Sequence, residues 1–189
     1  MTVLQTDRLT LRRFTEADGD LLWDLDRDPA VMRFLNGGRP TPREVVREKV
    51  LPGILAEYGR WEAYGRWAAE ERETGEFLGW FALRPVEEDP GSLELGYRLK
   101  RSAWGQGYGA EGARALVRLA FAQPGVERVV ASTMTVNVAS RRVMEKAGLR
   151  LVRTFFQDWP EVIEGSEAGD VEYALTRAEW QGAPGGRVL

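Results

Sequence analysis

The sequence predicts a mixed, mostly antiparallel β-sheet with helices on both faces, in the α/β (α+β) class. Short segments of alternating polar and apolar residues, joined by tight turns, fill the first half and are typical of antiparallel strands. Two strand–helix units follow over residues 93–149, and such units form parallel pairs. The 189 residues suffice for one sizeable domain. We therefore expect a single domain over residues 1–180 and a flexible, glycine-rich tail over residues 181–189.

The first half begins with a predicted strand over Arg8–Phe14, where Leu9 and Leu11 alternate with charged residues. Thr15 and Asp18 have capping-box spacing and predict a helix start. Further helix starts are predicted at Asp28-Pro29 and at Thr41-Pro42, because Pro is favoured at the first helical position and Thr at the N-cap. The second of these helices, over Arg43–Tyr58, is expected to kink or split at Pro52-Gly53.

A hairpin and then the two strand–helix units complete the predicted order. The hairpin spans Arg66–Arg72 and Phe77–Arg84, and a polar connector is expected over Pro85–Gly91. The later segments are strands over Leu93–Leu99, Arg128–Thr133, Leu151–Gln157 and Val171–Thr176, with helices over Ala110–Phe121 and from Asn137 to Ala147.

Composition excludes several classes of chemistry. The chain has no Cys and no His, which removes a thiol nucleophile, the usual general base and the usual zinc ligands, so no metal is expected. A net charge of −3 argues against a broad nucleic-acid surface. No apolar run reaches the roughly 20 residues that span a bilayer. We expect a cytoplasmic protein that binds neither nucleic acid nor membrane.

The turn Trp104-Gly105-Gln106-Gly107-Tyr108-Gly109 lies between a predicted strand and a predicted helix. The first N–H groups of a helix lack partners within it, and the helix dipole adds partial positive charge there, so this position favours phosphate. Glycines let a pyrophosphate approach the backbone and tolerate positive φ. The pattern is neither the dinucleotide fingerprint nor a P-loop, and alone it also fits a flexible turn.

Together with the second unit, this turn resembles the GNAT superfamily of acyl-CoA N-acyltransferases, and within it the ribosomal-protein N-terminal acetyltransferase-like branch. The resemblance rests on WGQGYGAEGARAL (104–116), on Asn137-x-x-Ser140 and on Glu145-Lys146-x-Gly148-Leu149, with QTDRLTLRRFTEAD (5–18) and YALTRAEW (173–180) near the ends. Two positions depart from the common pattern. Trp104 replaces a frequent Gln or Arg, and Met144 replaces the Tyr that acts as general acid in many members.

The resemblance implies a GNAT-like sheet that is splayed at its central strand, where acetyl-CoA binds as co-substrate. Gly96 is the expected place for a bulge in that strand. The pyrophosphate is expected at the N–H groups of the turn, and the pantetheine arm at the strand backbone and at the start of the second helix. The expected cofactor-binding residues are Tyr97, Arg98, Leu99, Trp104, Gly105, Gln106, Gly107, Tyr108, Gly109, Ala110, Asn137, Ser140 and Met144.

The implied reaction is direct transfer of an acetyl group to a primary amine in a ternary complex, which the absence of Cys fits. Glu94 is the first candidate for the general base and Ser140 for the group near the sulfur, and Glu70 and Asp158 are weaker candidates for the base. A protein N-terminus and a small amine remain open as acceptors. A non-catalytic acyl-CoA sensor is the alternative, and a nucleotide binder on another fold the third reading. The frequency of two-fold dimers favours a homodimer.

Overall fold

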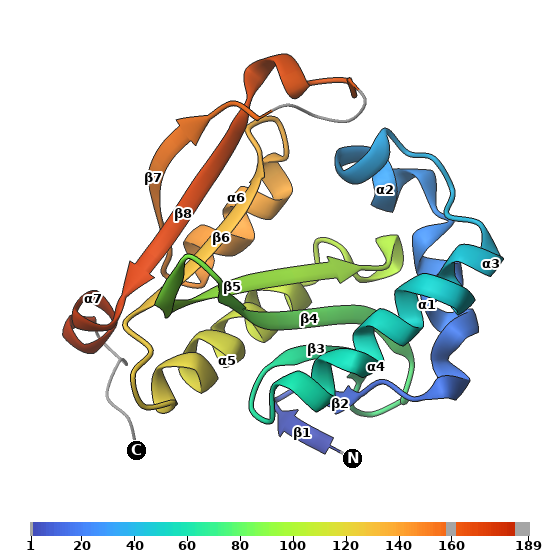
Figure 1. Cartoon of the computed structure of the whole chain (residues 1–189), viewed down its shortest axis with the longest axis horizontal. Coiled ribbons are helices and arrows are strands. Elements are labelled where there is room, and N and C mark those ends of the chain that lie inside the picture. Colours follow the sequence, from blue (N-terminus) through green and yellow to red (C-terminus); the bar gives the residue numbers. More distant parts are fainter. Residues whose placement is uncertain (1, 158–161, 184–189) are drawn as a thin grey trace. The chain divides into compact units, whose positions relative to one another are not determined.

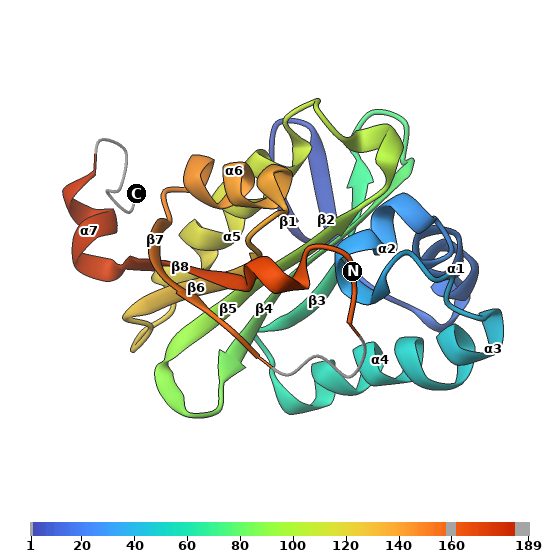
Figure 2. The same ribbon diagram turned by 90° about the horizontal axis from the view of Figure 1, so that it is seen from above.

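Eight strands form one sheet within the parts of the chain that the computed structural model describes, residues 2–157 and 162–183 (Figures 1 and 2). Their order is β1-β2-β3-β4-β5-β6-β8-β7. The pair β5–β6 is parallel, whereas β1–β2, β2–β3, β6–β8 and β7–β8 are antiparallel. The expected mixed, mostly antiparallel sheet is confirmed. The strands are β1 Thr2–Gln5, β2 Leu9–Arg13, β3 Gly65–Glu71, β4 Phe77–Val86, β5 Asp89–Leu99, β6 Arg128–Met134, β7 Arg150–Phe155 and β8 Asp170–Thr176.

Six of the described helices lie between strands, where the sequence predicted helices, and a seventh, α7, follows β8 and was not predicted. They are α1 Gly19–Asp26, α2 Pro29–Asn36, α3 Arg43–Val45, α4 Leu51–Arg60, α5 Tyr108–Ala122, α6 Val138–Lys146 and α7 Arg177–Gly182. Short 3₁₀ turns cover Glu16–Asp18, Arg101–Ala103 and Ser166–Ala168. No helix in the described part of the chain is long and apolar enough to cross a membrane.

The chain divides into two compact units. Unit 1 contains the chain up to Ala82 together with Tyr97–Gly109, and unit 2 contains Leu83–Gly96 together with the chain from Ala110 onward. Strands β4 and β5 each contribute to both units, so no linker separates them. The expected tail overlaps α7 at Gln181 and Gly182, and residues 184–189 lie outside the described residues.

The core of unit 1 forms where α1 and α4 pack on strands β3 and β4. Leu22 and Leu25 of α1 and Ile54 of α4 are at most 1% exposed, and they cluster with Ala68 and Trp80 of the strands. The helical spacing of Leu22 and Leu25 puts both on the face that meets the sheet. Burying each such side chain contributes about 1.5–3 kcal/mol.

Capping explains where the first helices begin and end. The Asp18 carboxylate accepts from the Thr15 N–H at 2.7 Å, as the capping-box spacing predicted. Asp28 accepts from the Ala30 N–H at 2.9 Å with Pro29 at the first helical position, and α2 ends at Gly37 with φ of 75°. These interactions between near neighbours in sequence account for the helix start at Thr15–Asp18 and for both ends of α2.

The predicted break near Pro52 takes the form of a π-turn. Residues Val46–Val50 form it directly before α4, whose second residue is Pro52. Proline has no N–H and its ring clashes with the carbonyl one turn earlier, so the preceding turn widens. The helix continues through α3, the π-turn and α4 to Arg60.

Unit 2 is built on the antiparallel pair β6–β8. The pairing runs along the whole of β6, from Arg128 opposite Thr176 to Met134 opposite Asp170. At the C-terminal end, Trp180 of α7 stacks on Phe121 of α5 with ring centroids 5.1 Å apart. The Arg177 guanidinium donates to the carbonyls of Phe121, Gln123 and Val126 at 2.8–2.9 Å, which fixes α7 against the end of α5.

The main differences from the prediction lie at three places in the chain. The connector expected over Pro85–Gly91 is wrong, because β4 continues to Val86 and β5 begins at Asp89, where Ser92 donates to the Asp89 carboxylate at 2.5 Å. Strand pairing here overrides the low strand propensity of acidic residues, Pro and Gly. Strand β1 was not predicted. Helix α5 starts at Tyr108 rather than Ala110, so Gly109 is helical.

Candidate active site

The glycine turn lies where β5 and the 3₁₀ turn Arg101–Ala103 lead into α5. Gly105 and Gly107 have φ of 73° and 87°, conformations that L residues with a Cβ rarely adopt. A Cβ at Gly105 would meet no heavy atom within 4 Å, so the backbone is open there. The fifteen-residue helix α5 begins at Tyr108, directly after the turn. This arrangement is suited to an anion.

Arg8, the residue directly before β2, contacts this turn. Its Nη1 donates to the Gln106 carbonyl at 2.9 Å, and its guanidinium lies 4.4 Å from the centroid of the Tyr108 ring. A Cβ at Gly107 would approach Arg8 Nη2 at 3.3 Å. Ninety-eight residues separate Arg8 from Gln106 in sequence, and no local pattern pointed to Arg8.

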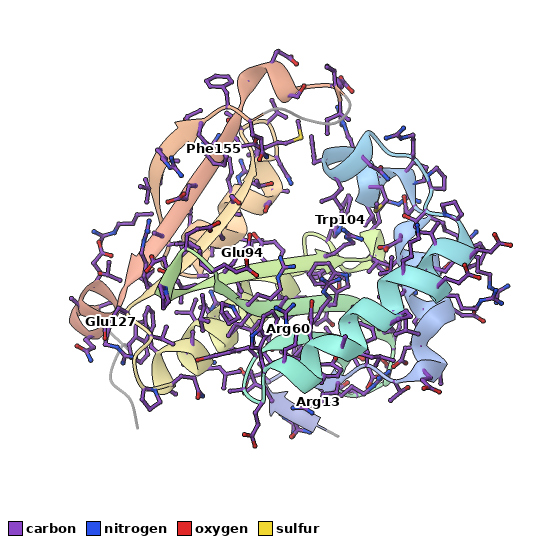
Figure 3. All side chains as sticks on the ribbon, viewed as in Figure 1. Arg13, Arg60, Glu94, Trp104, Glu127 and Phe155 are labelled. Atoms are coloured by element: carbon purple, nitrogen blue, oxygen red, sulfur yellow. The ribbon has the colours of Figure 1, made fainter. Side chains whose placement is uncertain are left out.

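Trp104 contacts the last residue of β5, Leu99, within unit 1 (Figure 3). Its indole Nε1 donates to the Leu99 carbonyl at 2.9 Å, while 46% of the residue stays exposed. One lone pair of that carbonyl is therefore used within the protein. Leu99 itself is buried.

The side chains of the other two expected residues at the end of β5, Tyr97 and Arg98, contact neighbouring side chains within unit 1. Tyr97 packs on Phe81 with ring centroids 6.1 Å apart. Arg98 Nη1 donates to the Asp26 carboxylate at 2.5 Å, and Asp26 is 2% exposed. A buried ion pair of this kind fixes α1 against β5, and losing one partner leaves an uncompensated charge.

Glu94 lies on β5 within unit 2 (Figure 3). Its Oε2 accepts from Arg84 Nη2 at 2.8 Å, and the two side chains are 40% and 38% exposed. The parallel register of β5 with β6 covers Ser92–Glu94 opposite Arg128–Val130. In the described residues, β6 is thus paired with β5 over three positions and with β8 over seven.

Asn137 is the N-cap of α6. Its Oδ1 accepts from the Ser140 N–H at 3.3 Å, and its Nδ2 donates to Thr133 Oγ1 at 3.0 Å. The side chain thereby ties the end of β6 to the first turn of α6, where Ser140 lies. Met144, one turn further on, is 2% exposed and belongs to the core.

The remaining candidates differ in surroundings. Ala110 in the first turn of α5 is buried. Glu70 accepts from Arg12 Nε at 2.6 Å, so this carboxylate belongs to a structural ion pair. Asp158 lies outside the described residues. The turn residues up to Gly109 fall in unit 1, whereas Glu94, Asn137 and Ser140 fall in unit 2.

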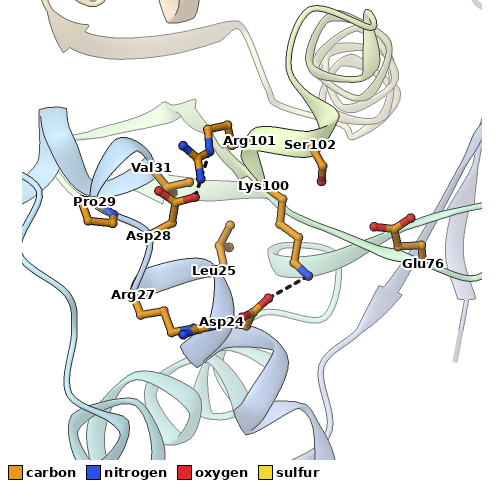
Figure 4. Close-up of a pocket in the computed structure, with 10 residues that line it drawn as sticks. All are labelled: Asp24, Leu25, Arg27, Asp28, Pro29, Val31, Glu76, Lys100, Arg101 and Ser102. Atoms are coloured by element: carbon orange, nitrogen blue, oxygen red, sulfur yellow. Dashed lines mark hydrogen bonds and ion pairs between the residues drawn. The ribbon is translucent and has the colours of Figure 1, made fainter.

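A pocket of about 660 Å³ in unit 1 borders the residues that precede the turn (Figure 4). Its charges are largely matched within its own wall, because Asp24 pairs with Lys100 at 3.0 Å and Asp28 with Arg101 at 3.3 Å. Hydrogen bonds from Arg27 and Lys100 hold the pKa of Asp24 below its usual value. The described residues contain no group of three acidic side chains placed to hold a metal ion.

Comparisons with known proteins place the chain in one family. A family model described as an acetyltransferase (GNAT) domain matches residues 8–150. The FsC-acetyl coenzyme A-N(2)-transacetylase of Aspergillus fumigatus is 39% identical over 193 residues, which cover 94% of this chain and 77% of that protein. The aminoglycoside N(6')-acetyltransferase type 1 of Klebsiella pneumoniae is 31% identical over 159 residues, covering 75% and 74% of the two chains.

Solved structures agree. An aminoglycoside acetyltransferase, AAC(6')-Ib, in complex with coenzyme A superposes with a TM-score of 0.73 at 25% identity over 93% of this chain and 98% of that one. RimL, a ribosomal-protein acetyltransferase in complex with coenzyme A, has a TM-score of 0.77 at 22% identity over the same shares and supports the fold. The chain belongs to the GNAT acetyltransferases, and it is an acetyl-CoA-dependent enzyme of that family.

Proposed function

We propose that this enzyme N-acetylates a primary amine with the acetyl group of acetyl-CoA, and that the glycine turn before α5 holds the pyrophosphate. The observation that carries the proposal is the open, positive-φ backbone at Gly105, followed by the start of a fifteen-residue helix. A chain that offers its first helical N–H groups there suits a phosphate group without further cations.

The sheet supplies backbone for the pantetheine arm. Within the described residues, the parallel pairing of β5 with β6 ends at Glu94 opposite Val130, and β6 continues to Met134 paired with β8. Backbone groups of the later β6 residues are thus available for an amide-containing arm. Asn137 holds the start of α6 at the end of this strand.

For the acceptor we propose a small amine rather than a protein N-terminus. The relative at 39% identity is named for transfer to N(2) of FsC, and the relative at 31% identity for transfer to N(6') of an aminoglycoside. The ribosomal-protein enzyme shares the fold at 22% identity, which carries no argument about the acceptor. The alternative acceptor, a peptide N-terminus, is tested directly below.

The chemistry requires one proton acceptor and one proton donor from the chain or from water. An amine reaches the enzyme protonated, with a pKa near ~8 for an α-amine or ~10 for a side-chain amine. Once it has lost that proton, its nitrogen attacks the thioester carbonyl, the C–N bond forms, the C–S bond breaks, and the thiolate leaves and takes up a proton. No acyl-enzyme is involved, which fits a chain without cysteine.

We assign proton removal to Glu94 and proton delivery to Ser140. Within the described residues, the Arg84 pair uses Oε2 of Glu94, which leaves Oε1 for a water or an amine proton. The exposed fraction of 40% gives that oxygen access to solvent. Ser140 lies in the first turn of α6, and the Asn137 cap fixes its backbone.

The first experiment measures release of the coenzyme A thiol against a panel of small amines and N-terminal peptides. The protein has no thiol of its own, so every thiol detected comes from the reaction. We expect turnover with a small amine and intersecting initial-velocity lines, which indicate a ternary complex. Parallel lines would refute direct transfer. Binding of acetyl-CoA without turnover of any amine would favour a non-catalytic sensor.

The second experiment tests the residue assignment. Glu94→Gln is expected to lower kcat/KM by about 100-fold or more, because general bases contribute about 10²–10⁴-fold. The exposed Glu88 in the turn between β4 and β5 offers a matched control, and Glu88→Gln is expected to have no effect. Activity of Glu94→Gln within twofold of wild type across the pH range would remove Glu94 from the mechanism. Ser140→Ala tests the proton donor in the same way.

A further inference from the structure

Arg8 makes three contacts with the glycine turn, all within unit 1. Its Nη1 donates to the Gln106 carbonyl, its guanidinium faces the Tyr108 ring, and its Nη2 lies beside the bare Cα of Gly107. The backbone of Arg8 is itself held, because its carbonyl accepts from the Arg72 N–H at 2.8 Å. The side chain therefore reaches the turn from a fixed base.

The bond to the Gln106 carbonyl sets the direction of the next N–H group. No cis peptide bond occurs among the described residues, so the Gln106–Gly107 peptide is trans. In a planar trans peptide the C=O of one residue and the N–H of the next point in opposite directions. With the Gln106 carbonyl on Arg8, the Gly107 N–H points to the opposite side of the turn.

The glycine at position 107 makes this approach of Arg8 feasible. A Cβ there would lie 3.3 Å from Arg8 Nη2, a tighter contact than most real Cβ atoms make, and φ is 87°. At Gly105, by contrast, a Cβ would meet nothing within 4 Å. The two glycines therefore differ: Gly105 leaves space open to a ligand, and Gly107 leaves space for Arg8.

The Tyr108 ring fixes the guanidinium. The ring is 8% exposed, so it is a rigid surface, and the guanidinium lies 4.4 Å from its centroid. Arginine stacks on aromatic faces through its planar guanidinium, which lysine lacks. The stack and the hydrogen bond together define one orientation for the side chain.

We propose that Arg8 is a positioning residue for the pyrophosphate of acetyl-CoA, which acts by holding the Gln106–Gly107 peptide with its N–H directed at the phosphates. The inference rests on the proposed function and adds to it a residue from the other end of the sequence. Arg8 acts through the turn, so its effect is confined to ligands that carry the pyrophosphate.

The test measures dissociation constants for coenzyme A and for pantetheine, which lacks the phosphates, by titration calorimetry. Arg8→Met is expected to raise the dissociation constant for coenzyme A by about 10- to 100-fold, the range for the loss of a hydrogen bond that involves a charged group. Pantetheine affinity is expected to stay within about twofold of wild type, since that ligand does not reach the turn. KM for acetyl-CoA should rise by the same factor as the dissociation constant, with kcat at saturation unchanged.

Two further variants separate positioning from charge. Arg47→Met removes another exposed arginine of unit 1, one that pairs with Glu48, and it is expected to leave both affinities unchanged. Arg8→Lys keeps the charge but loses the stacking of the guanidinium on the Tyr108 ring. We expect it to raise the dissociation constant for coenzyme A at least about fivefold.

Several results overturn the inference. They are wild-type affinity for coenzyme A in Arg8→Lys or Arg8→Met, or equal losses for coenzyme A and pantetheine. A wild-type protein that binds no coenzyme A would instead overturn the proposed function itself, and this inference with it.

Discussion

Replacing Gly79 by Ala tests how closely β4 approaches β5 in unit 1. A Cβ built at Gly79 lies 2.1 Å from the Arg98 carbonyl oxygen and 2.7 Å from the Leu99 Cα. Both neighbours are backbone atoms, so no side-chain rotation relieves the contact. The φ of Gly79 is 137°, a value that L residues with a Cβ rarely adopt.

The cost follows from these two effects. Holding a non-glycine residue in such a backbone region costs about 1–3 kcal/mol, and forcing extra volume into packed structure costs about 1–3 kcal/mol more. The free energy of unfolding should therefore fall by about 2–6 kcal/mol in Gly79→Ala. For a domain of this length each kcal/mol lowers Tm by about 2–4 °C, which gives a loss of about 4–24 °C.

Two other glycines supply matched controls for thermal unfolding. Gly75 has φ of 73° with nothing within 4 Å of its Cβ position, so Gly75→Ala carries only the backbone cost, about 1–2 kcal/mol. Gly59 is helical and equally open, and Gly59→Ala should raise stability by about 0.5–1 kcal/mol. From the highest Tm to the lowest, the expected order is Gly59→Ala, wild type, Gly75→Ala and Gly79→Ala. If Gly79→Ala melts within 2 °C of Gly75→Ala, the steric argument is wrong.

Three further predictions concern Asp18, which is buried, and Tyr58, which is partly buried. Asp18→Asn should cost about 2–4 kcal/mol in the free energy of unfolding, because Asp18 is 5% exposed and accepts two bonds from Arg12 at 2.8 and 2.9 Å. Burial raises the pKa of Asp18, but bonds from Arg12 and Thr15 outweigh it and the pKa is lowered. In denaturant titrations, the difference in the free energy of unfolding between wild type and Asp18→Asn should therefore have its largest value at pH 6 and shrink below about pH 4. A difference that stays constant with pH would contradict this linkage between protonation and stability. Tyr58→Phe should cost about 1–3 kcal/mol, since the Phe14 N–H donates to the Tyr58 hydroxyl at 2.9 Å; an unchanged denaturation midpoint would show that water replaces it.

Local rules predicted the first helices and most strands well. The Thr15–Asp18 box, the Asp28-Pro29 start and the widened turn before Pro52 all follow from the chemistry of a few neighbouring residues. Such effects act within one turn of the chain, so the sequence contains all that decides them. The extension of β4 and β5 across Pro85–Gly91 was missed because strand pairing, not local propensity, decides it.

In the candidate site, too, features set by neighbouring residues were predicted and contacts between distant segments were not. The glycine turn and the Asn137 cap were found because each is a short pattern next to a helix start. Arg8 and the Arg84 partner of Glu94 were not found, because each comes from a different strand. The cofactor-binding role of Met144 stays a prediction, and its side chain is 2% exposed.

The makeup of unit 1 has a consequence for synthesis of the chain on the ribosome. The unit consists of the chain up to Ala82 and the segment Tyr97–Gly109, with fourteen residues of unit 2, Leu83–Gly96, between them. A nascent chain that has emerged only to Gly96 therefore lacks the C-terminal end of β5, Tyr97–Leu99, and the glycine turn, and Arg8 has no Gln106 to bind. At about 5–20 residues per second the missing segment emerges within a few seconds. The part of unit 1 proposed to hold the pyrophosphate is thus the last part of that unit to be synthesised.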